Sequence, residues 1–150
     1  MQVTTSFEIL CTAISAAFIA QLLKFLGYLI VHRTINFKIL TTTGGMPSSH
    51  SAGTVALSVS VGLICGYDSV EFAIATGYTL IVLYDAAGLR RAAGKTAACL
   101  NKMMEEFYNH DLHAVGGKLK ELLGHTPLEV FVGAVYGVLF AFYFHMLIVG

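Results

Sequence analysis

Charged residues are scarce in this sequence: they make up 12% of its 150 residues, against 56% for hydrophobic residues. Soluble domains carry about 25% charged residues, so this composition excludes an ordinary soluble domain and indicates an integral membrane protein. Nine Lys and Arg residues balance nine Asp and Glu residues. Without an excess of either sign, nothing indicates a nucleic-acid partner or an acidic tail. A chain of this length has room for one domain, residues 1–150.

Cysteine is rare as well. Cys11, Cys65 and Cys99 stand far apart, which argues against both a disulfide framework and a zinc cluster. A cleaved signal peptide is not expected, because no basic residue precedes the first apolar run and that run is too long. A nucleotide-binding P-loop is excluded too: residues 94–96 resemble its end, but Leu89 stands where the leading glycine belongs.

Four apolar stretches have roughly the length that a transmembrane helix needs. They run over residues 7–31, 49–65, 70–83 and 124–149. Between the last two, residues 92–123 are polar and helix-forming with an apolar stripe, which predicts an amphipathic segment on the membrane surface, broken at Gly116-Gly117. The expected fold is an all-α polytopic membrane bundle of about four transmembrane helices plus this cytoplasmic amphipathic segment.

The distribution of basic residues predicts the orientation. Arg33 and Lys38 lie between the first two stretches and six Lys and Arg residues between the last two, whereas residues 66–69 contain none. Basic loops tend to stay in the cytoplasm, so both basic connections are expected there and both termini outside. Lys24 lies near the end of the first stretch, and we expect it to snorkel to the interface rather than to bind substrate.

The first candidate site is the stretch Gly44–Ser51, which joins two apolar stretches. Its paired glycines let the backbone approach an anion, and Ser48 or Ser49 as N-cap leaves first-turn N–H groups free for a phosphate. The same residues also suit a simple turn and helix cap. His50 favours a functional site over a simple turn, because a histidine at the mouth of an apolar segment is costly unless it is paired or faces water.

The second candidate is the stretch from His125 to Glu129. On a helix this spacing places both side chains on one face, so Glu129 can hold one ring nitrogen and leave the other as a nucleophile or base. The stretch also has the pattern of a capping box, with Thr126 at the N-cap, Pro127 first in the helix and Glu129 third. In that case Glu129 bonds the backbone and His125 precedes the helix. The two alternatives stay open.

The third candidate is Asp85 with Arg90 and Arg91. Adjacent arginines beside a polar surface usually set topology or contact lipid head groups. An aspartate at membrane depth instead suggests a functional site. Asp85 can hold Arg90 or Arg91 in position for bidentate phosphate binding.

Three motifs together resemble the divergent branch of the type 2 phosphatidic acid phosphatase family, which is related to acid phosphatases and vanadium-dependent haloperoxidases. They are Gly-Gly-Met-Pro-Ser-Ser-His-Ser-Ala at 44–52, Tyr-Asp-Ala-Ala-Gly-Leu-Arg-Arg at 84–91 and Gly-His-Thr-Pro-Leu-Glu-Val at 124–130. The resemblance covers nearly the whole chain. It implies a bacterial inner membrane or a plant organelle membrane, with the site facing the cytoplasm.

The resemblance also assigns roles to residues. The superfamily uses a Pro-Ser-Gly-His motif to contact phosphate and protonate the leaving group, and a later histidine with an orienting carboxylate as nucleophile. By resemblance, Ser48 and Ser49 contact phosphate, His50 is the general acid, His125 is the nucleophile and Glu129 orients its ring.

The cations depart from the family pattern. Leu119 stands where an arginine is usual, and the leading Lys-x6-Arg-Pro motif is missing. The available substitutes for phosphate binding are Lys38, Arg90 and Arg91, with Asp85 beside the arginines. The resemblance implies no cofactor and no metal ion.

The expected function is hydrolysis of a phosphate ester or diphosphate on a lipid, such as phosphatidate or a prenyl diphosphate, through a phosphohistidine. A phosphorylated lipid and the membrane lipids are the expected partners, and assembly into a homo-oligomer stays open. One alternative is a protein that binds or transports a phosphorylated lipid without chemistry. The other is a metal-dependent membrane hydrolase whose ligands are His50, Asp85, His125 and Glu129.

Overall fold

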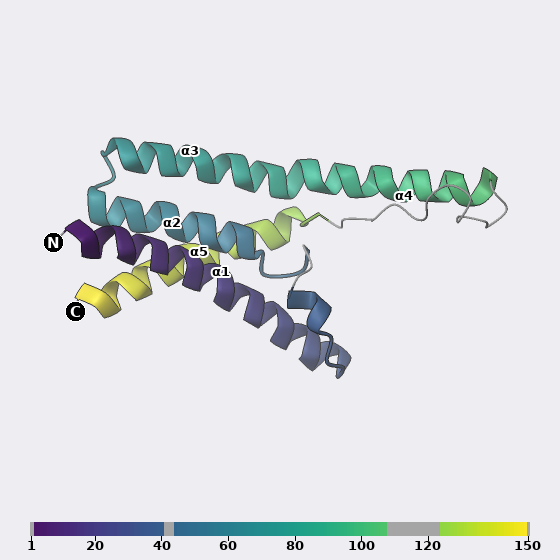
Figure 1. Ribbon diagram of the computed structural model, residues 1–150, viewed down its shortest axis with the longest axis horizontal. Coiled ribbons are helices and arrows are strands. Elements are labelled where there is room, and N and C mark those ends of the chain that lie inside the picture. Colours follow the sequence, from purple (N-terminus) through teal and green to yellow (C-terminus); the bar gives the residue numbers. More distant parts are fainter. Residues whose placement is uncertain (1, 41–43, 108–123, 150) are drawn as a thin grey trace.

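The computed structural model describes residues 2–40, 44–107 and 124–149, and within them the fold is all-α (Figure 1). This confirms the predicted fold class. The elements in chain order are α1 (Gln2–His32), the 3-10 helix η1 (Phe37–Leu40), α2 (Ser49–Cys65), α3 (Val70–Tyr84), the π-helical turn η2 (Asp85–Leu89), α4 (Arg90–Phe107) and α5 (Pro127–Val149).

Helix α2 lies at the centre of the bundle, in contact with α1, α3 and α5, and α1 also packs against α5. The core where they meet is built from small side chains, which let membrane helices approach one another closely. Five alanines in this core have no exposed surface: Ala16, Ala20, Ala52, Ala56 and Ala141.

Two glycines let α5 lie directly on α2. A Cβ added to Gly133 would lie 2.6 Å from the carbonyl oxygen of Ser48, and one on Gly137 would lie 2.5 Å from that of Ala52. The spacing Gly133-x-x-x-Gly137 is therefore used for close helix packing, as is typical of membrane helices. This contact places the start of α5 beside the start of α2.

Among the described residues, three helical segments are long and apolar enough to cross a membrane: Ser6–His32, Val70–Phe107 and Pro127–Ile148. The remaining predicted span, Ser49–Cys65, is a shorter apolar helix of 17 residues. At 1.5 Å per residue it is about 26 Å long, slightly less than the roughly 30 Å of a bilayer's hydrocarbon core.

The third predicted span does not end near residue 83. Helix α3 continues through η2 into α4, so that residues 70–107 form one long helix whose far part extends beyond the bundle (Figure 1). No proline interrupts these residues, and the backbone hydrogen bonds continue through the π turn. Residues 92–107 thus continue the axis of α3 instead of forming a separate surface segment. The expected break at Gly116-Gly117 lies outside the described residues.

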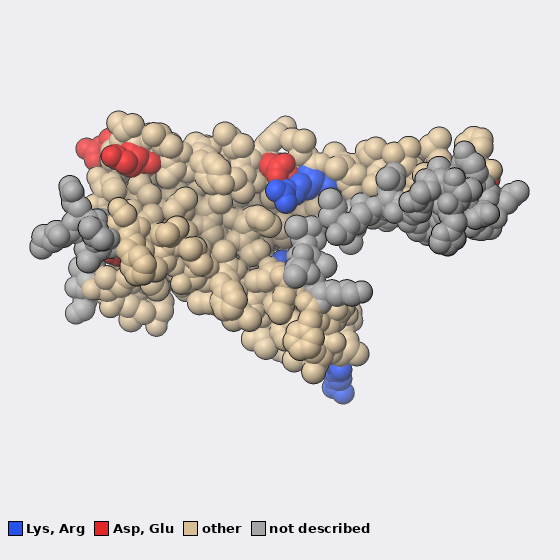
Figure 2. Space-filling view, in the orientation of Figure 1, with Lys and Arg blue, Asp and Glu red and all other residues tan. Residues whose placement is uncertain are grey.

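The two ends of the bundle differ in what they carry. The described chain begins and ends at the same end as the turn between α2 and α3, whereas the starts of α2 and α5 lie at the other end (Figure 1). Figure 2 shows helix surfaces almost free of charge, with acidic side chains at the first end and an acidic and a basic group side by side midway along the long helix. That pair is Asp85 and Arg90.

Candidate functional site

The start of α2 is shaped by two glycines and a capping serine. Gly44 and Gly45 have φ values of 111° and 85°, a conformation that side chains with a Cβ rarely adopt. Ser48 is the N-cap, and its Oγ accepts hydrogen bonds from the backbone N of Ser51 at 3.3 Å and from the Ser51 hydroxyl at 2.9 Å. Both serines have no exposed surface, while Ser49 is half-buried.

At the start of α5, the two alternatives for Glu129 occur together. The Thr126 Oγ1 accepts a hydrogen bond from the Glu129 backbone N at 3.3 Å, and Glu129 Oε2 accepts one from the Thr126 backbone N at 3.0 Å. The same Oε2 lies 3.2 Å from His125 Nδ1. Glu129 therefore completes the capping box and also holds the histidine ring. The backbone N of Ser48 donates to the Glu129 carbonyl oxygen at 3.2 Å, which ties the two helix starts together.

His125 is almost fully buried, at 1% exposed, and only one of its ring nitrogens is engaged. Its Nε2 is buried and has no hydrogen-bond partner among the described residues. Burial lowers the pKa of His125 most strongly, and the positive charges of Lys24 and His50 lower it further, while the hydrogen bond to Glu129 partly opposes them. His125 is therefore neutral near neutral pH, with a nitrogen lone pair available.

The second histidine of the site lies beside the first. The ring centroids of His50 and His125 are 6.3 Å apart, and the ring planes meet at 64°. Residues 50 and 125 come from different helix starts, and the packing of α5 on α2 brings them together. Both rings line one small cavity.

The remaining wall of this cavity comes from the π turn and its neighbours. Val82, Asp85, Ala86 and Arg90 complete the lining, and the enclosed volume is about 10 Å³. Arg90 Nε donates to Asp85 Oδ2 at 2.7 Å, and both side chains are partly exposed. The space suits about one water molecule, so a phosphoryl group between the rings requires the lining side chains to separate. Single π turns inside helices are frequent at functional sites.

Of the two predicted arginines, Arg90 lines the cavity with the histidines, and Arg91 does not. Arg91 is exposed, and it contributes its backbone as a packing surface for Gly124. A Cβ on Gly124 would collide with the backbone of Arg90 and Arg91. Gly124 thus lets the segment that carries His125 approach the long helix.

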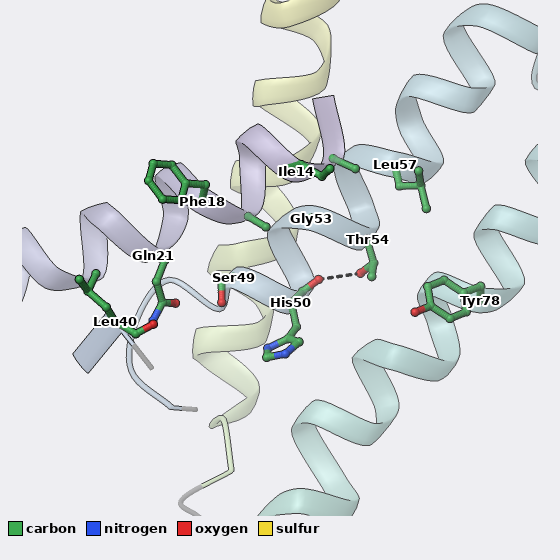
Figure 3. Close-up of a pocket in the computed structure, with 12 residues that line it drawn as sticks. Ile14, Phe18, Gln21, Leu40, Ser49, His50, Gly53, Thr54, Leu57 and Tyr78 are labelled. Carbon is green, nitrogen blue, oxygen red and sulfur yellow. Dashed lines mark hydrogen bonds between the residues drawn. The ribbon is translucent and has the colours of Figure 1, made fainter. Parts of the chain in front are cut away.

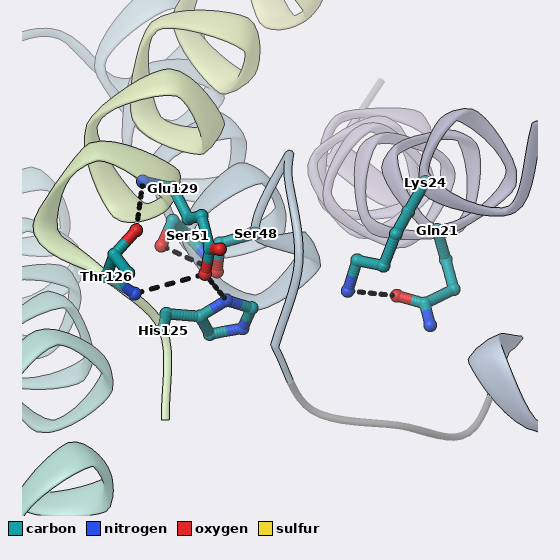
Figure 4. A network of polar contacts seen from close by, with 7 residues as sticks. All are labelled: Gln21, Lys24, Ser48, Ser51, His125, Thr126 and Glu129. Atoms are coloured by element: carbon teal, nitrogen blue, oxygen red, sulfur yellow. Dashed lines mark hydrogen bonds and ion pairs between the residues drawn. The ribbon is translucent and has the colours of Figure 1, made fainter. Parts of the chain in front are cut away.

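Lys24 does not snorkel to an interface. Only 6% of its surface is exposed, because its chain lies under the glycine-rich loop, where a Cβ on Gly45 would be 3.3 Å from its Cδ. Its Nζ donates to Gln21 Oε1 at 3.2 Å (Figure 4). The Gln21 amide in turn donates to the carbonyl oxygens of Ile39 and Leu40. Among the described residues, no carboxylate lies within ion-pair distance of Nζ.

The sequence contained a signal for this position. A lysine inside an apolar run is costly unless it is paired or serves a function, and Lys24 is followed by seven further apolar or aromatic residues before His32. Reading it as a snorkelling residue was wrong, because Gly45 lies against the side chain and Gln21, which binds its Nζ, is itself bonded to η1.

Two further expectations concern cations and metals. Lys38 belongs to η1, but its side chain lies outside what the structure describes. In the described part of the chain, no group of three or more His, Cys, Asp or Glu side chains is placed to hold a metal ion. The four residues considered as metal ligands therefore do not form such a group there.

The fold and the site define a class: a helical membrane protein with a buried, carboxylate-held histidine that faces a second histidine at the mouths of two helices. Within this class, the chain belongs to the divergent PAP2 family, whose model matches residues 5–140. The resemblance inferred from the three motifs is thereby confirmed. All candidate site residues fall inside the matched range.

One relative matches the chain along almost the full length of both proteins. The chain is 40% identical over 149 residues to YuiD, an uncharacterised membrane protein of Bacillus subtilis (strain 168), covering 93% of this chain and 94% of that protein. No solved structure matches the chain.

Proposed function

We propose that this membrane protein hydrolyses a phosphate ester or a diphosphate on a lipid, through an intermediate in which the phosphoryl group is bound to His125. The observation that carries the proposal is the state of the His125 ring: Glu129 holds Nδ1, while Nε2 is buried beside His50 and has no hydrogen-bond partner in the described part of the chain. A neutral imidazole held in this way is suited to nucleophilic attack.

In the first step, the Nε2 lone pair of His125 attacks phosphorus. The N–P bond forms while the bond from phosphorus to the leaving oxygen breaks, which is the lipid oxygen of a phosphate ester or the bridging oxygen of a diphosphate. Protonated His50 gives its proton to that leaving oxygen. In the second step, water attacks the phosphohistidine and gives a proton to His50. The N–P bond breaks, inorganic phosphate leaves, and both histidines return to their starting states.

Positive groups around the two rings supply the stabilisation that phosphoryl transfer depends on. Arg90 lies in the cavity with the histidines, and the positive charge of Lys24 is one of the causes that lower the pKa of His125. Lys24 is buried with a neutral amide as its hydrogen-bond partner, an arrangement that an anionic ligand would balance. Lys24 and Arg90 thus take the place of the cations that the superfamily draws from motifs missing here.

The proposal is tested on purified protein in detergent or liposomes, with phosphatidate and a prenyl diphosphate as substrates. We expect phosphate release that persists with a chelator, and a trapped phosphoenzyme that is labile to acid and stable to base. His125→Ala should abolish both, and His50→Ala should slow release by about 100-fold or more, as expected for a lost general acid. Full turnover by His125→Ala would disprove the mechanism. Loss of turnover with chelator would point to a metal-dependent hydrolase, and tight binding without turnover to a binding protein.

A further inference from the structure

A second, larger space begins at His50 and runs along the outside of α2. It is an open groove of about 710 Å³, within the range of pockets that hold small organic ligands. α1 forms one wall, α2 the floor and α3 the other wall (Figure 3). The lining residues are Ala13, Ile14, Ala17, Phe18, Gln21, Leu40, Ser49, His50, Gly53, Thr54, Leu57 and Tyr78.

The floor of the groove is a single stripe of α2. His50, Gly53, Thr54 and Leu57 follow the spacing of residues that share one face of a helix. From Ser49 to Leu57 this stripe rises about 12 Å along the helix axis. α1 packs closely on α2 at Gly53: a Cβ there would lie 3.0 Å from the Ala17 Cβ and 3.2 Å from the Ala13 carbonyl oxygen.

The groove is polar at one end and mostly apolar along the rest, where Thr54 and Tyr78 are the other polar side chains among the described lining residues. His50, Ser49 and Gln21 lie at the end near the candidate site, while Ile14 and Phe18 line the wall farther along (Figure 3). Ile14, Phe18 and Tyr78 are all more than half exposed, so the groove is open on the side that faces lipid in a membrane. This polarity matches a molecule with an anionic head and an apolar chain.

His50 is the residue that the groove and the cavity with His125 have in common. A nucleophile and a leaving group take opposite sides of a phosphorus atom in an in-line displacement. With His125 as nucleophile, the leaving oxygen and the chain attached to it therefore extend toward His50, which is where the groove begins.

From this continuity we infer that the groove between α1 and α3 holds one hydrocarbon chain of the lipid phosphate substrate and enters the active site from the bilayer at His50. The inference rests on the proposed function and specifies its leaving group. That group is a long-chain alcohol or lipid phosphate, and its chain lies over Gly53 and Leu57. Ordinary bilayer lipid is the competing occupant.

Photocrosslinking in liposomes tests the occupant without requiring turnover. The probe is a long-chain alkyl monophosphate with a diazirine at mid-chain, and the control probe is the same chain ending in an alcohol. We expect the phosphate probe to label peptides of α1 and α3 that contain Ile14, Phe18 or Tyr78 several-fold more than the alcohol probe does. Excess unlabelled alkyl phosphate should suppress this labelling. Equal labelling by both probes, or labelling centred on α5, would overturn the inference.

A substitution in the groove gives a second, independent measurement. Leu57→Trp fills the floor, whereas the control Leu80→Trp places the same ring on an exposed part of α3 that does not line the groove. We expect Leu57→Trp to lower the ratio of kcat/KM for a long-chain phosphate to that for a short-chain phosphate by at least ten-fold, and Leu80→Trp to leave it unchanged. An unchanged ratio in Leu57→Trp would refute the groove. Labelling without any hydrolysis would retain the groove as a lipid phosphate site while the proposed reaction fails.

Discussion

A single carboxylate oxygen of Glu129 holds the His125 ring and closes the first turn of α5. Glu129 Oε2 lies 3.2 Å from His125 Nδ1 and 3.0 Å from the backbone N of Thr126. The orientation of the histidine is therefore coupled to the geometry of the helix start. A capping box and a histidine–carboxylate pair, which the spacing alone left as alternatives, are one structure here.

The two duties of Glu129 can be separated by substitution. Glu129→Gln keeps a side chain able to cap but removes the charge behind His125, and we expect kcat to fall roughly 10- to 100-fold, since hydrogen bonds to charged groups contribute about 1.5–3 kcal/mol. Thr126→Ala removes one half of the capping box and should cost about 1 kcal/mol of stability while kcat stays near that of the wild type. Steady-state kinetics and thermal unfolding of both variants provide the measurement. Equal kcat values in Glu129→Gln and the wild type would show that Glu129 serves only to cap the helix.

The pH profile should report the burial of His125. Burial and the charges of Lys24 and His50 lower its pKa below the ordinary value of 6.5, and the nucleophile must be unprotonated. Activity should therefore rise with pH through this lowered pKa, so that the acid limb of kcat/KM has its midpoint below 6.5. Glu129→Gln removes an influence that raises the pKa and should move the limb to lower pH. An acid limb above the ordinary histidine value would contradict this.

Lys24 should matter for binding of the phosphoryl group. Lys24→Met keeps most of the length of the side chain but removes the charge. We expect kcat/KM to fall roughly 10- to 100-fold, the loss of a charge-assisted contact worth about 1.5–3 kcal/mol. Lys95→Met changes an exposed lysine of α4 and is the matched control. Inorganic phosphate should also inhibit the Lys24→Met enzyme less strongly. Wild-type kinetics and phosphate inhibition in Lys24→Met would remove this residue from the site.

Gly124 should tolerate no side chain. Gly124→Ala forces the segment before α5 away from the backbone of Arg90 and Arg91, and overpacking of this kind typically costs about 1–3 kcal/mol. Because His125 follows directly, turnover should fall along with stability. Gly77→Ala is the control, since a Cβ there meets nothing within 4 Å. Thermal unfolding and turnover of the two variants decide the question, and equal behaviour would show that the close approach at Gly124 has no consequence.

Much of the fold follows from local properties of the chain. Long apolar runs form helices in a membrane because no water is present to satisfy the backbone, so the helices around Ala16, Ala52 and Ala141 could be expected from hydropathy. The helix starts at Ser48 and Thr126 could be expected as well, since capping depends on residues three positions apart. The motifs around His50 and His125 also predicted that these histidines belong to the candidate site.

The sequence by itself thus determined the membrane class, the helical fold and the two histidine-bearing helix starts, because each depends on neighbours within one or two turns. Tertiary structure decided what depends on distant segments. Packing of Gly133 and Gly137 on α2 brings His50 to within 6.3 Å of His125. Gly45, 21 positions along the chain, lies against Lys24 and helps to bury it, and the continuous helix through η2 places Arg90 beside the histidines. The free-energy cost of a polar side chain in a membrane depends on the groups that surround it. Here residues distant in the sequence supply those groups.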